Sequence, residues 1–458
     1  MKWIAPVALS FAMTVSGLAV PAAGAADLPQ PTKDILKELK LDESILNGLD
    51  AELQVPAGWV EKAKQEKDLI IVSSWDQNQF AKMTRAFKLR YPFINLRYAR
   101  ASYNARVVKT LIAYKEGRHI TDILTGFGGG VSLFKDIDAL ADLSDIPNFR
   151  KLKKDNRDPD SRWLGQRLRY WCMAYNTKLV KEADLPKRWE DLITNKRWHN
   201  RKIGIANRPQ LWLLMLWAAK GPEWTTDYMK RLVEEVKPQL RKEGTNALIS
   251  LAIAGEFDAA IPAAAYRTSQ YVAKGAPIGW HCPEPIPLAI SEMGILKGAP
   301  HIHAAKIFSN WFLSKEGQIA QFASNNAPPV HPELQTNRFL VFPDAVLGKE
   351  IAFRAPDLEK RLSKEMYTAW NPLWSKATGE SGPKKLVKFN ITLKDIKRGG
   401  RRIYFSHKGK DRRMSISGRR TKVYINGKMD DRANLKPGMT CAITAPEKAR
   451  EAKTVSCK

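Results

Sequence analysis

Acidic side chains are scarce in this chain. Its 458 residues include 47 Asp and Glu against 75 Lys and Arg, which gives a formal net charge of +28. Residues 381–458 hold 22 Lys/Arg and 6 Asp/Glu, a charge of 22 − 6 = +16, which leaves 28 − 16 = +12 for the rest. This asymmetry predicts that the last segment is a separate unit. A basic surface of this kind can bind polyanions, because phosphate-rich partners release counterions when they are neutralised.

Long apolar runs are also few. Only the N-terminus, from Ile4 to Val20, is mostly apolar; it follows Lys2 and precedes the small residues Ala23-Gly24-Ala25. This pattern predicts a cleavable signal peptide over residues 1–25. After it we find no run near the ~20 apolar residues that a membrane span requires. No cysteine stands directly after the cleavage site, so we expect an exported protein without a lipid anchor, located in the periplasm.

Cysteine is rare: Cys172, Cys282, Cys441 and Cys457 are the four. An even number in an oxidising compartment allows two disulfides with three possible connectivities. Cys441 and Cys457 lie at the ends of β-type runs in one short segment, and we predict that they pair. None of the four has metal-type spacing, and we expect no metal site and no cofactor.

Motifs for nucleophilic catalysis are lacking. There is no Gly-x-Ser-x-Gly sequence, and Ser73-Ser74 has no identifiable histidine partner. The carboxylate pair Glu234-Glu235 lies on a charged helical stretch. We therefore expect that the protein is not an enzyme.

Alternating strand and helix patterns are what the chain does contain. Short apolar β-branched runs at 68–74, 94–99 and 120–125 alternate with helical patterns at 77–91 and 104–117. Within the second helix we expect Val107, Val108, Leu111 and Ile112 to face inward. This order predicts an α/β protein with a parallel, doubly wound sheet.

Three segments carry a resemblance to a known family. They are Tyr175-Asn-Thr with Pro186, Trp189 and Asp191-Leu; Tyr91-Pro92-Phe93-Ile94; and the stretch from Ile290 through Ala299-Pro300 to Glu316-Gly-Gln318. Together they resemble the family 1 extracellular solute-binding proteins of ABC importers, of the type II periplasmic-binding class and similar to its ferric-ion and organic-anion branch. The resemblance implies a two-lobed clamp, expected to be a monomer, that delivers a small ligand to an inner-membrane permease.

The resemblance and the composition together give a domain plan. We expect the signal peptide over 1–25, a helical extension over 26–66, lobe 1 over 67–171 and 285–330, lobe 2 over 172–284 and 331–375, a linker over 376–385, and a basic OB-like β domain over 386–458. In this last domain, short β-type runs at 386–391, 402–405, 413–416, 423–425 and 440–444 predict five strands, and Asn426-Gly427 is a hairpin signal. The resemblance also places Cys172 and Cys282 near the two crossovers between lobes. A disulfide between them is expected on that ground.

Ligands of open parallel sheets bind beyond the carboxyl ends of the strands. Three segments should lie there: Ser73, Ser74 and Trp75; Thr125, Gly126 and Phe127; and Asn207 with Arg208. The last two precede predicted helix starts at Val131 and Leu211, where free N–H groups favour an anion. We expect these residues to contact the ligand.

Tyr266 and Arg267 follow a further predicted strand. Ferric-binding members of the resembled family place adjacent tyrosines near this point, whereas this chain has one tyrosine followed by a cation, which disfavours a trivalent metal. We therefore predict a small anionic metabolite as the ligand. Glu284, at the second crossover, either binds a ligand donor or supports the hinge. The alternative function is an exported protein that binds an anionic cell-envelope polymer through its basic C-terminal domain.

Overall fold

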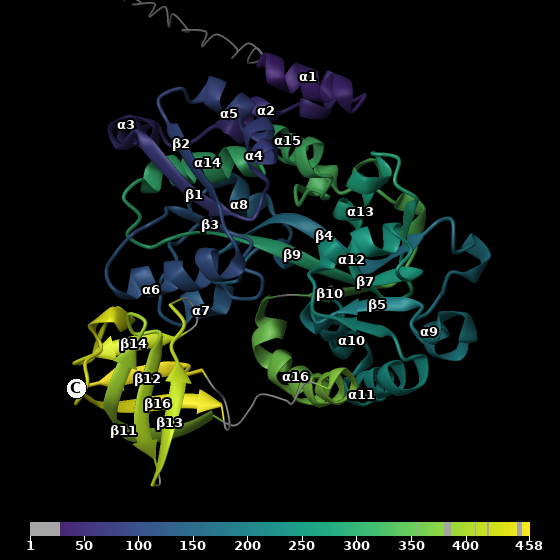
Figure 1. Cartoon of the computed structure of the whole chain (residues 1–458). Coiled ribbons are helices and arrows are strands. Elements are labelled where there is room, and N and C mark those ends of the chain that lie inside the picture. Colours follow the sequence, from purple (N-terminus) through teal and green to yellow (C-terminus); the bar gives the residue numbers. More distant parts are fainter. Residues whose placement is uncertain (1–27, 355, 380–385, 408, 419–420, 447–450) are drawn as a thin grey trace, which may run out of the picture. The chain divides into compact units, whose positions relative to one another are not determined.

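The structure is a computed structural model that describes residues 28–354, 356–379, 386–407, 409–418, 421–446 and 451–458 (Figure 1). The predicted signal peptide, residues 1–25, lies outside this range, as do residues 380–385 of the predicted linker. The chain divides into two compact units, Met1–Trp370 and Asn371–Lys458. Each unit is described by itself.

One mixed sheet of ten strands forms the framework of the first unit. Its main order is β2-β1-β3-β9-β4-β7-β5-β6, with β10 beside β9 and β8 beside β4. The strands are β1 Asp68–Ser73, β2 Asn95–Arg100, β3 Ile123–Thr125, β4 Leu164–Asn176, β5 Ile203–Ala206, β6 Gln239–Arg241, β7 Ala259–Ala264, β8 Ile278–His281, β9 Ile286–Ile295 and β10 Ile351–Arg354.

The parallel arrangement predicted for residues 68–125 is confirmed. Strand β1 pairs in parallel with β2 and with β3. The sheet as a whole is mixed, however, because β9 runs antiparallel to both β3 and β4, and β4 runs antiparallel to β7. These antiparallel strands are the ones that carry the chain from one half of the sheet to the other.

Two long strands connect the halves. The first part of β4, from Leu164 to Tyr170, pairs with β9, and its last part, from Trp171 to Tyr175, pairs with β7. The last residues of β9 pair in turn with β3. Figure 1 shows β4 and β9 passing from the part that contains β1–β3 to the part that contains β5 and β7. This is a two-lobed α/β architecture in which β4 and β9 form the crossovers.

Helices cover both halves of the sheet. In the first unit they are α1 Gln30–Glu38, α2 Leu49–Leu53, α3 Ala57–Glu66, α4 Gln77–Met83, α5 Arg85–Arg90, α6 Lys109–Lys115, α7 Val131–Lys135, α8 Pro147–Lys151, α9 Asp191–Thr194, α10 Leu213–Lys220, α11 Pro222–Arg231, α12 Thr245–Ile253, α13 Ala265–Val272, α14 Ile302–Leu313 and α15 Lys315–Asn325; α16, Pro356–Thr378, crosses the boundary between the units. Among the helices that the structure describes, none has the length and apolarity needed to cross a membrane.

One expectation about inward-facing residues is wrong. Val108 and Ile112 are 38% and 39% exposed, whereas Val107 is fully buried. The cause is local, because Asn104–Val108 form a π-helical turn, η2, ahead of α6. A π turn closes on i→i+5 hydrogen bonds and shifts the faces of the residues that follow.

The second unit contains an all-β sheet of seven strands in the order β13-β12-β11-β16-β17-β14-β15. They are β11 Leu386–Lys397, β12 Arg402–His407, β13 Lys410–Ser415, β14 Lys422–Ile425, β15 Lys428–Met429, β16 Thr440–Pro446 and β17 Thr454–Cys457. Asn426 and Gly427 join β14 to β15 with φ angles of 51° and 78°, as a two-residue hairpin turn requires. The sequence predicted β11–β14 and β16; it missed β15 and β17. The OB-like assignment stays a prediction.

Both predicted disulfides are present. Cys441 and Cys457 are paired across β16 and β17, with Cα atoms 4.0 Å apart. Cys172 on β4 is bonded to Cys282, which lies between β8 and β9, with Cα atoms 5.1 Å apart. The second bond therefore ties together the two chain segments that connect the lobes.

Candidate functional site

The carboxyl ends of β1 and β3 bring two predicted site residues together. Ser73 Oγ and Thr125 Oγ1 lie 2.5 Å apart, and both residues are fully buried. Because β1 and β3 are parallel neighbours, their last residues meet at one edge of the sheet. Ser74, the next residue, is exposed at this edge.

Two of the aromatic residues expected to contact the ligand, Trp75 and Phe127, lie in the protein core. Trp75 is 1% exposed and packs against Phe80 and Phe312, with ring centroids 6.1 and 5.8 Å away. Phe127 is fully buried against Phe134. Protein atoms cover both rings, so neither ring is free to stack on a ligand in this structure. Burial of their apolar ring carbons stabilises the lobe, although the Trp75 indole N–H is buried without a hydrogen-bond partner.

The glycine-rich turn after β3 is held by an arginine. Gly126 has φ of 65°, and its carbonyl oxygen accepts hydrogen bonds from Arg106 Nε at 3.0 Å and Nη2 at 2.6 Å. Arg106 is only 6% exposed. The helix that follows, α7, has five residues, so its dipole is short. The cation at this turn is therefore a stronger source of positive potential than the helix start that the sequence suggested.

A second buried arginine lies on the crossover strand β4. Arg167 is 5% exposed, and its Nε atom has no hydrogen-bond partner. Within the described chain, no carboxylate lies at ion-pair distance from its guanidinium. Burying an unpaired charge is costly, so such a group usually serves a ligand or a partner.

The second lobe contributes Tyr266 and Arg267, at the start of α13. The Arg167 guanidinium lies 5.2 Å from the centroid of the Tyr266 ring. Arg267 reaches Asp76 of the first lobe, with 3.6 Å between Nη1 and Oδ2. We call Arg106, Arg167, Arg267, Tyr98, Tyr266 and Asp76 the Arg167 cluster. It combines three cations with one carboxylate and contains residues from both lobes. A second buried carboxylate, Glu292, acts on Arg106 and opposes the lowering of its pKa by burial.

Burial sets the protonation of this cluster. It lowers the pKa of Arg167, an effect that Tyr266, Tyr98 and Asp76 oppose. Burial also lowers the pKa of Arg106. It raises the pKa of Tyr98 to about 12, and the Tyr98 hydroxyl donates to the Trp75 carbonyl at 2.7 Å. The environment therefore favours any ligand that brings negative charge, and it disfavours a phenolate at Tyr98.

Asn207 and Arg208 lie after β5, and the side chains of both already form hydrogen bonds within the protein. The Asn207 amide oxygen accepts from Trp370 Nε1 at 2.9 Å. Arg208 is exposed, and its Nη1 donates to the Asn207 carbonyl at 2.8 Å. The following helix, α10, begins at Leu213 rather than at Leu211. No hydrogen bond or ion pair joins Arg208 to the Arg167 cluster within the described residues.

Glu284 belongs to the hinge. Its Oε2 atom accepts the Glu350 backbone N–H at 3.0 Å, and its own N–H donates to the Lys187 carbonyl at 2.9 Å. Of the two roles considered for it, these contacts fit hinge support.

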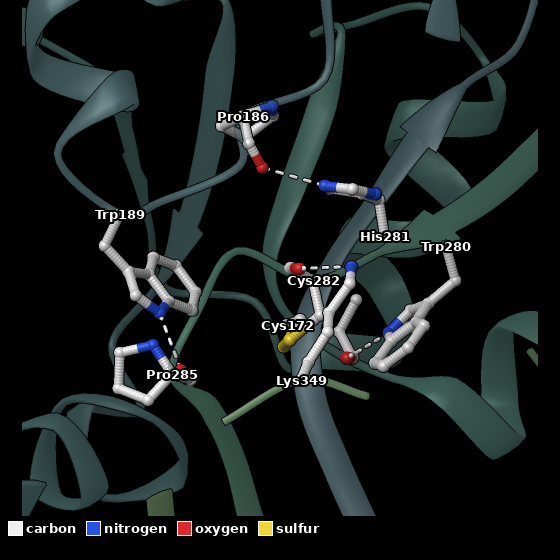
Figure 2. Close-up of a disulfide and its surroundings, with 9 residues drawn as sticks. Cys172, Pro186, Trp189, Trp280, His281, Cys282, Pro285 and Lys349 are labelled. Atoms are coloured by element: carbon white, nitrogen blue, oxygen red, sulfur yellow. Dashed lines mark hydrogen bonds between the residues drawn. A yellow bond between two sulfur atoms is a disulfide. The ribbon is translucent and has the colours of Figure 1, made fainter. Parts of the chain in front are cut away.

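The surroundings of the hinge disulfide are polar and closely bonded (Figure 2). Lys349 Nζ donates to the Cys282 carbonyl at 3.3 Å, and Trp189 Nε1 donates to the Pro285 carbonyl at 3.0 Å. His281 Nε2 lies 2.8 Å from the Pro186 carbonyl oxygen. These bonds fix the second crossover against lobe 2.

One group of three possible metal ligands occurs in the described residues: Glu52, His331 and Glu333. Glu52 is already used, because its carboxylate accepts His331 Nε2 at 2.9 Å and the Lys315 N–H at 2.8 Å. It is 4% exposed and ties α2 to the start of α15. These contacts give the group a structural role.

Sequence reasoning missed Arg106, Arg167, Tyr98 and Asp76. A signal existed for Arg167, because it interrupts a strand whose other residues are almost all buried. Arginine is rarely buried unless it is paired. Arg106 gave no comparable signal, since it lies in a helix that carries several exposed cations.

Comparisons with known proteins agree with this architecture. The profile of the family described as "bacterial extracellular solute-binding protein" matches residues 66–319. No curated protein matches the sequence significantly.

Among solved structures, iron-bound HitA from Pseudomonas aeruginosa has a TM-score of 0.56 at 18% identity, covering 67% of this chain and 99% of that one. IdiA (FutA) of Trichodesmium, solved with iron and citrate, has a TM-score of 0.55 at 18% identity, over 67% and 99%. An ABC transporter substrate-binding protein from Bradyrhizobium japonicum has 0.56 at 18% identity, over 68% and 99%. At these identities the likeness is one of fold.

Proposed function

Because the chain belongs to the bacterial extracellular solute-binding protein family, we propose that it binds a small anionic metabolite between its lobes and delivers it to an ABC permease. The predicted signal peptide supports a periplasmic location. The family is a class of binding proteins rather than of enzymes, and the match favours this function over polyanion binding by the C-terminal unit.

The observation that carries the anionic ligand is the buried, unpaired guanidinium of Arg167. It lies on a crossover strand and contacts the second lobe through Tyr266. A carboxylate or phosphate bound there would supply the missing counter-charge and accept charge-assisted hydrogen bonds. It would also link residues of both lobes, which stabilises the closed state over the open one.

Ferric ion is the competing ligand, since two of the similar structures are described as holding iron. A ferric site needs several anionic donors. Here Tyr266 is followed by Arg267, and the Tyr98 phenol has a raised pKa. Three buried or half-buried cations in one cluster add repulsion against a trivalent ion. These features support an organic anion instead.

The test is extraction of small molecules from the purified full-length protein. Mass spectrometry of the extract should detect an anionic compound in wild type and in Arg85→Gln, a matched variant at an exposed arginine of α5. The compound should be absent from Arg167→Gln. A neutral compound retained equally by all three proteins, or iron as the sole retained species, would contradict the proposal.

A further inference from the structure

A group of arginines lines a hollow on the second unit. Its volume is about 450 Å³, and its lining includes Arg398, Arg401, Arg402 and Arg432, the serines Ser415 and Ser417, Gly418 and one carboxylate, Glu451. Within this lining the formal charge is 4 − 1 = +3. Arg398, Arg401 and Arg402 make no ion pair or side-chain hydrogen bond with any described residue. Their guanidinium groups are therefore available to a ligand.

The backbone holds the hollow in shape. Arg398, Gly399 and Gly400 all have positive φ, at 57°, 57° and 73°, in the turn between β11 and β12. A Cβ atom on Gly400 would lie 1.9 Å from the Arg432 carbonyl oxygen, so a larger residue would prevent this close approach. The turn and the Arg432 segment are thus in direct contact.

Arg432 is fixed from the other side as well. Its Nη1 donates to the Ile416 carbonyl at 3.3 Å, and a Cβ atom on Gly418 would lie 2.6 Å from the same nitrogen. The Ile416 N–H in turn donates to the Arg401 carbonyl at 2.9 Å. These contacts preorganise one guanidinium next to three others, which reduces the entropy lost on binding.

We propose that this hollow binds a phosphate or sulfate group of an ester. A tetrahedral oxyanion has three or more acceptor oxygens, which matches several guanidinium forks better than a single carboxylate does. The two negative charges of a phosphate monoester would offset most of the excess of three, and the single charge of a sulfate monoester would offset part of it. The volume exceeds that of one such group and leaves room for the molecule that carries it. This site lies in the second unit and does not depend on the function proposed for the lobes.

The experiment uses the full-length protein at low salt, with inorganic pyrophosphate as the probe and hydrogen exchange as a local readout. Pyrophosphate should slow exchange in peptides covering residues 398–402 and 415–418. In Arg401→Gln/Arg402→Gln, the affinity for pyrophosphate that this protection reports should fall by about tenfold to a hundredfold, as loss of charge-assisted hydrogen bonds predicts. The protection should persist in Arg167→Gln, which separates this site from the lobes.

The matched control is Arg412→Gln/Arg413→Gln, which removes the same charge from exposed positions of β13 outside the hollow. The affinity of this control variant for pyrophosphate should stay within about threefold of wild type, as expected for screened surface charges. Equal loss in both double variants would overturn the site in favour of diffuse charge, as would absence of protection in wild type. Arg402→Lys, which keeps the charge, should bind pyrophosphate with intermediate affinity. Thermal melting checks that every variant is folded.

Two sources of the group are distinguished by the probe. Glycerol 3-phosphate represents a free phosphate ester, and vesicles containing phosphatidic acid represent a lipid headgroup. Binding of either that is lost in Arg401→Gln/Arg402→Gln supports the site and identifies its source. Failure of both probes and of pyrophosphate would overturn the proposal.

Discussion

The guanidinium of Arg167 lies 5.2 Å from the centroid of the Tyr266 ring, so that a buried cation of the crossover strand faces an aromatic ring of lobe 2. In a desolvated site such a contact contributes about 2 kcal/mol. Tyr266→Leu removes the ring that positions the guanidinium, so we expect it to weaken binding of the retained anion by about tenfold, whereas Tyr266→Phe, which keeps the ring, should stay within about threefold. Titration calorimetry measures both.

The same pair of variants separates an organic anion from iron. A ferric site at Tyr266 would give a visible phenolate-to-iron absorption band after incubation with ferric citrate. We expect no band in wild type. A band that disappears in Tyr266→Phe would show that Tyr266 is a metal ligand.

Arg167 should reduce the stability of the ligand-free protein, because its charge is buried without a carboxylate at ion-pair distance, and the Tyr266 ring does not neutralise it. Arg167→Gln removes that charge at similar length. We expect its free energy of unfolding to rise by about 1–3 kcal/mol, within the range seen when buried ionic groups are replaced. Chemical denaturation measures this, with Arg85→Gln expected within about 0.5 kcal/mol of wild type. A loss of more than 1 kcal/mol in Arg167→Gln would mean that the residue is structural.

The two disulfides should stabilise different units. Cys172–Cys282 spans a sequence separation of 110 residues in the first unit, and Cys441–Cys457 spans 16 in the second. Replacing both cysteines of either pair by serine should cost about 2–5 kcal/mol in its own unit. Calorimetric scans should show each double variant lowering a different transition. A shift of one common transition by both variants would contradict two independently folded units.

His281 should make the first unit sensitive to mild acid. Burial, with the nearby Lys349, lowers the pKa of His281 below its usual 6.5, against the raising effect of its bond to the Pro186 carbonyl. Above pH 6.5 the folded and unfolded forms are both neutral here, so no effect is expected. As the pH falls below 6.5, the unfolded form binds a proton that the folded form resists, and stability decreases. The loss between pH 7.5 and 5.5 should be smaller in His281→Gln but unchanged in His119→Gln, at an exposed position. Equal losses in all three proteins would assign the pH dependence to other groups.

The sequence predicted much of the architecture, because periodicity and family motifs report on burial. The parallel strands β1–β3, the hairpin at Asn426-Gly427 and both disulfides follow from such patterns. The predicted burial of Val108 and Ile112 was wrong, because a π turn changes the helical period. The residue pattern of the sequence does not indicate such a turn.

The candidate site was harder to predict. The rule that residues after parallel strands meet at one edge of the sheet agrees with the contact between Ser73 and Thr125. The same rule does not distinguish a ring that packs inward, such as Trp75, from a ring that faces a ligand. Arg167 lies within a strand rather than after one, and its role depends on which residues of the other lobe reach it. Contacts such as Arg267–Asp76 join positions almost 200 residues apart in the chain, and a single sequence does not reveal them.

The central claim is that Arg167 binds the negative charge of the ligand, and titration calorimetry tests it most directly. The anion retained by wild type is titrated into wild type, Arg167→Gln, Arg208→Gln and Arg85→Gln. Loss of charge-assisted hydrogen bonds worth about 1.5–3 kcal/mol predicts that Arg167→Gln binds roughly tenfold to more than a hundredfold more weakly. The exposed Arg208 should matter far less than Arg167, and Arg85 should not matter. Unchanged affinity in Arg167→Gln, or binding of ferric ion where no anion binds, would contradict the account.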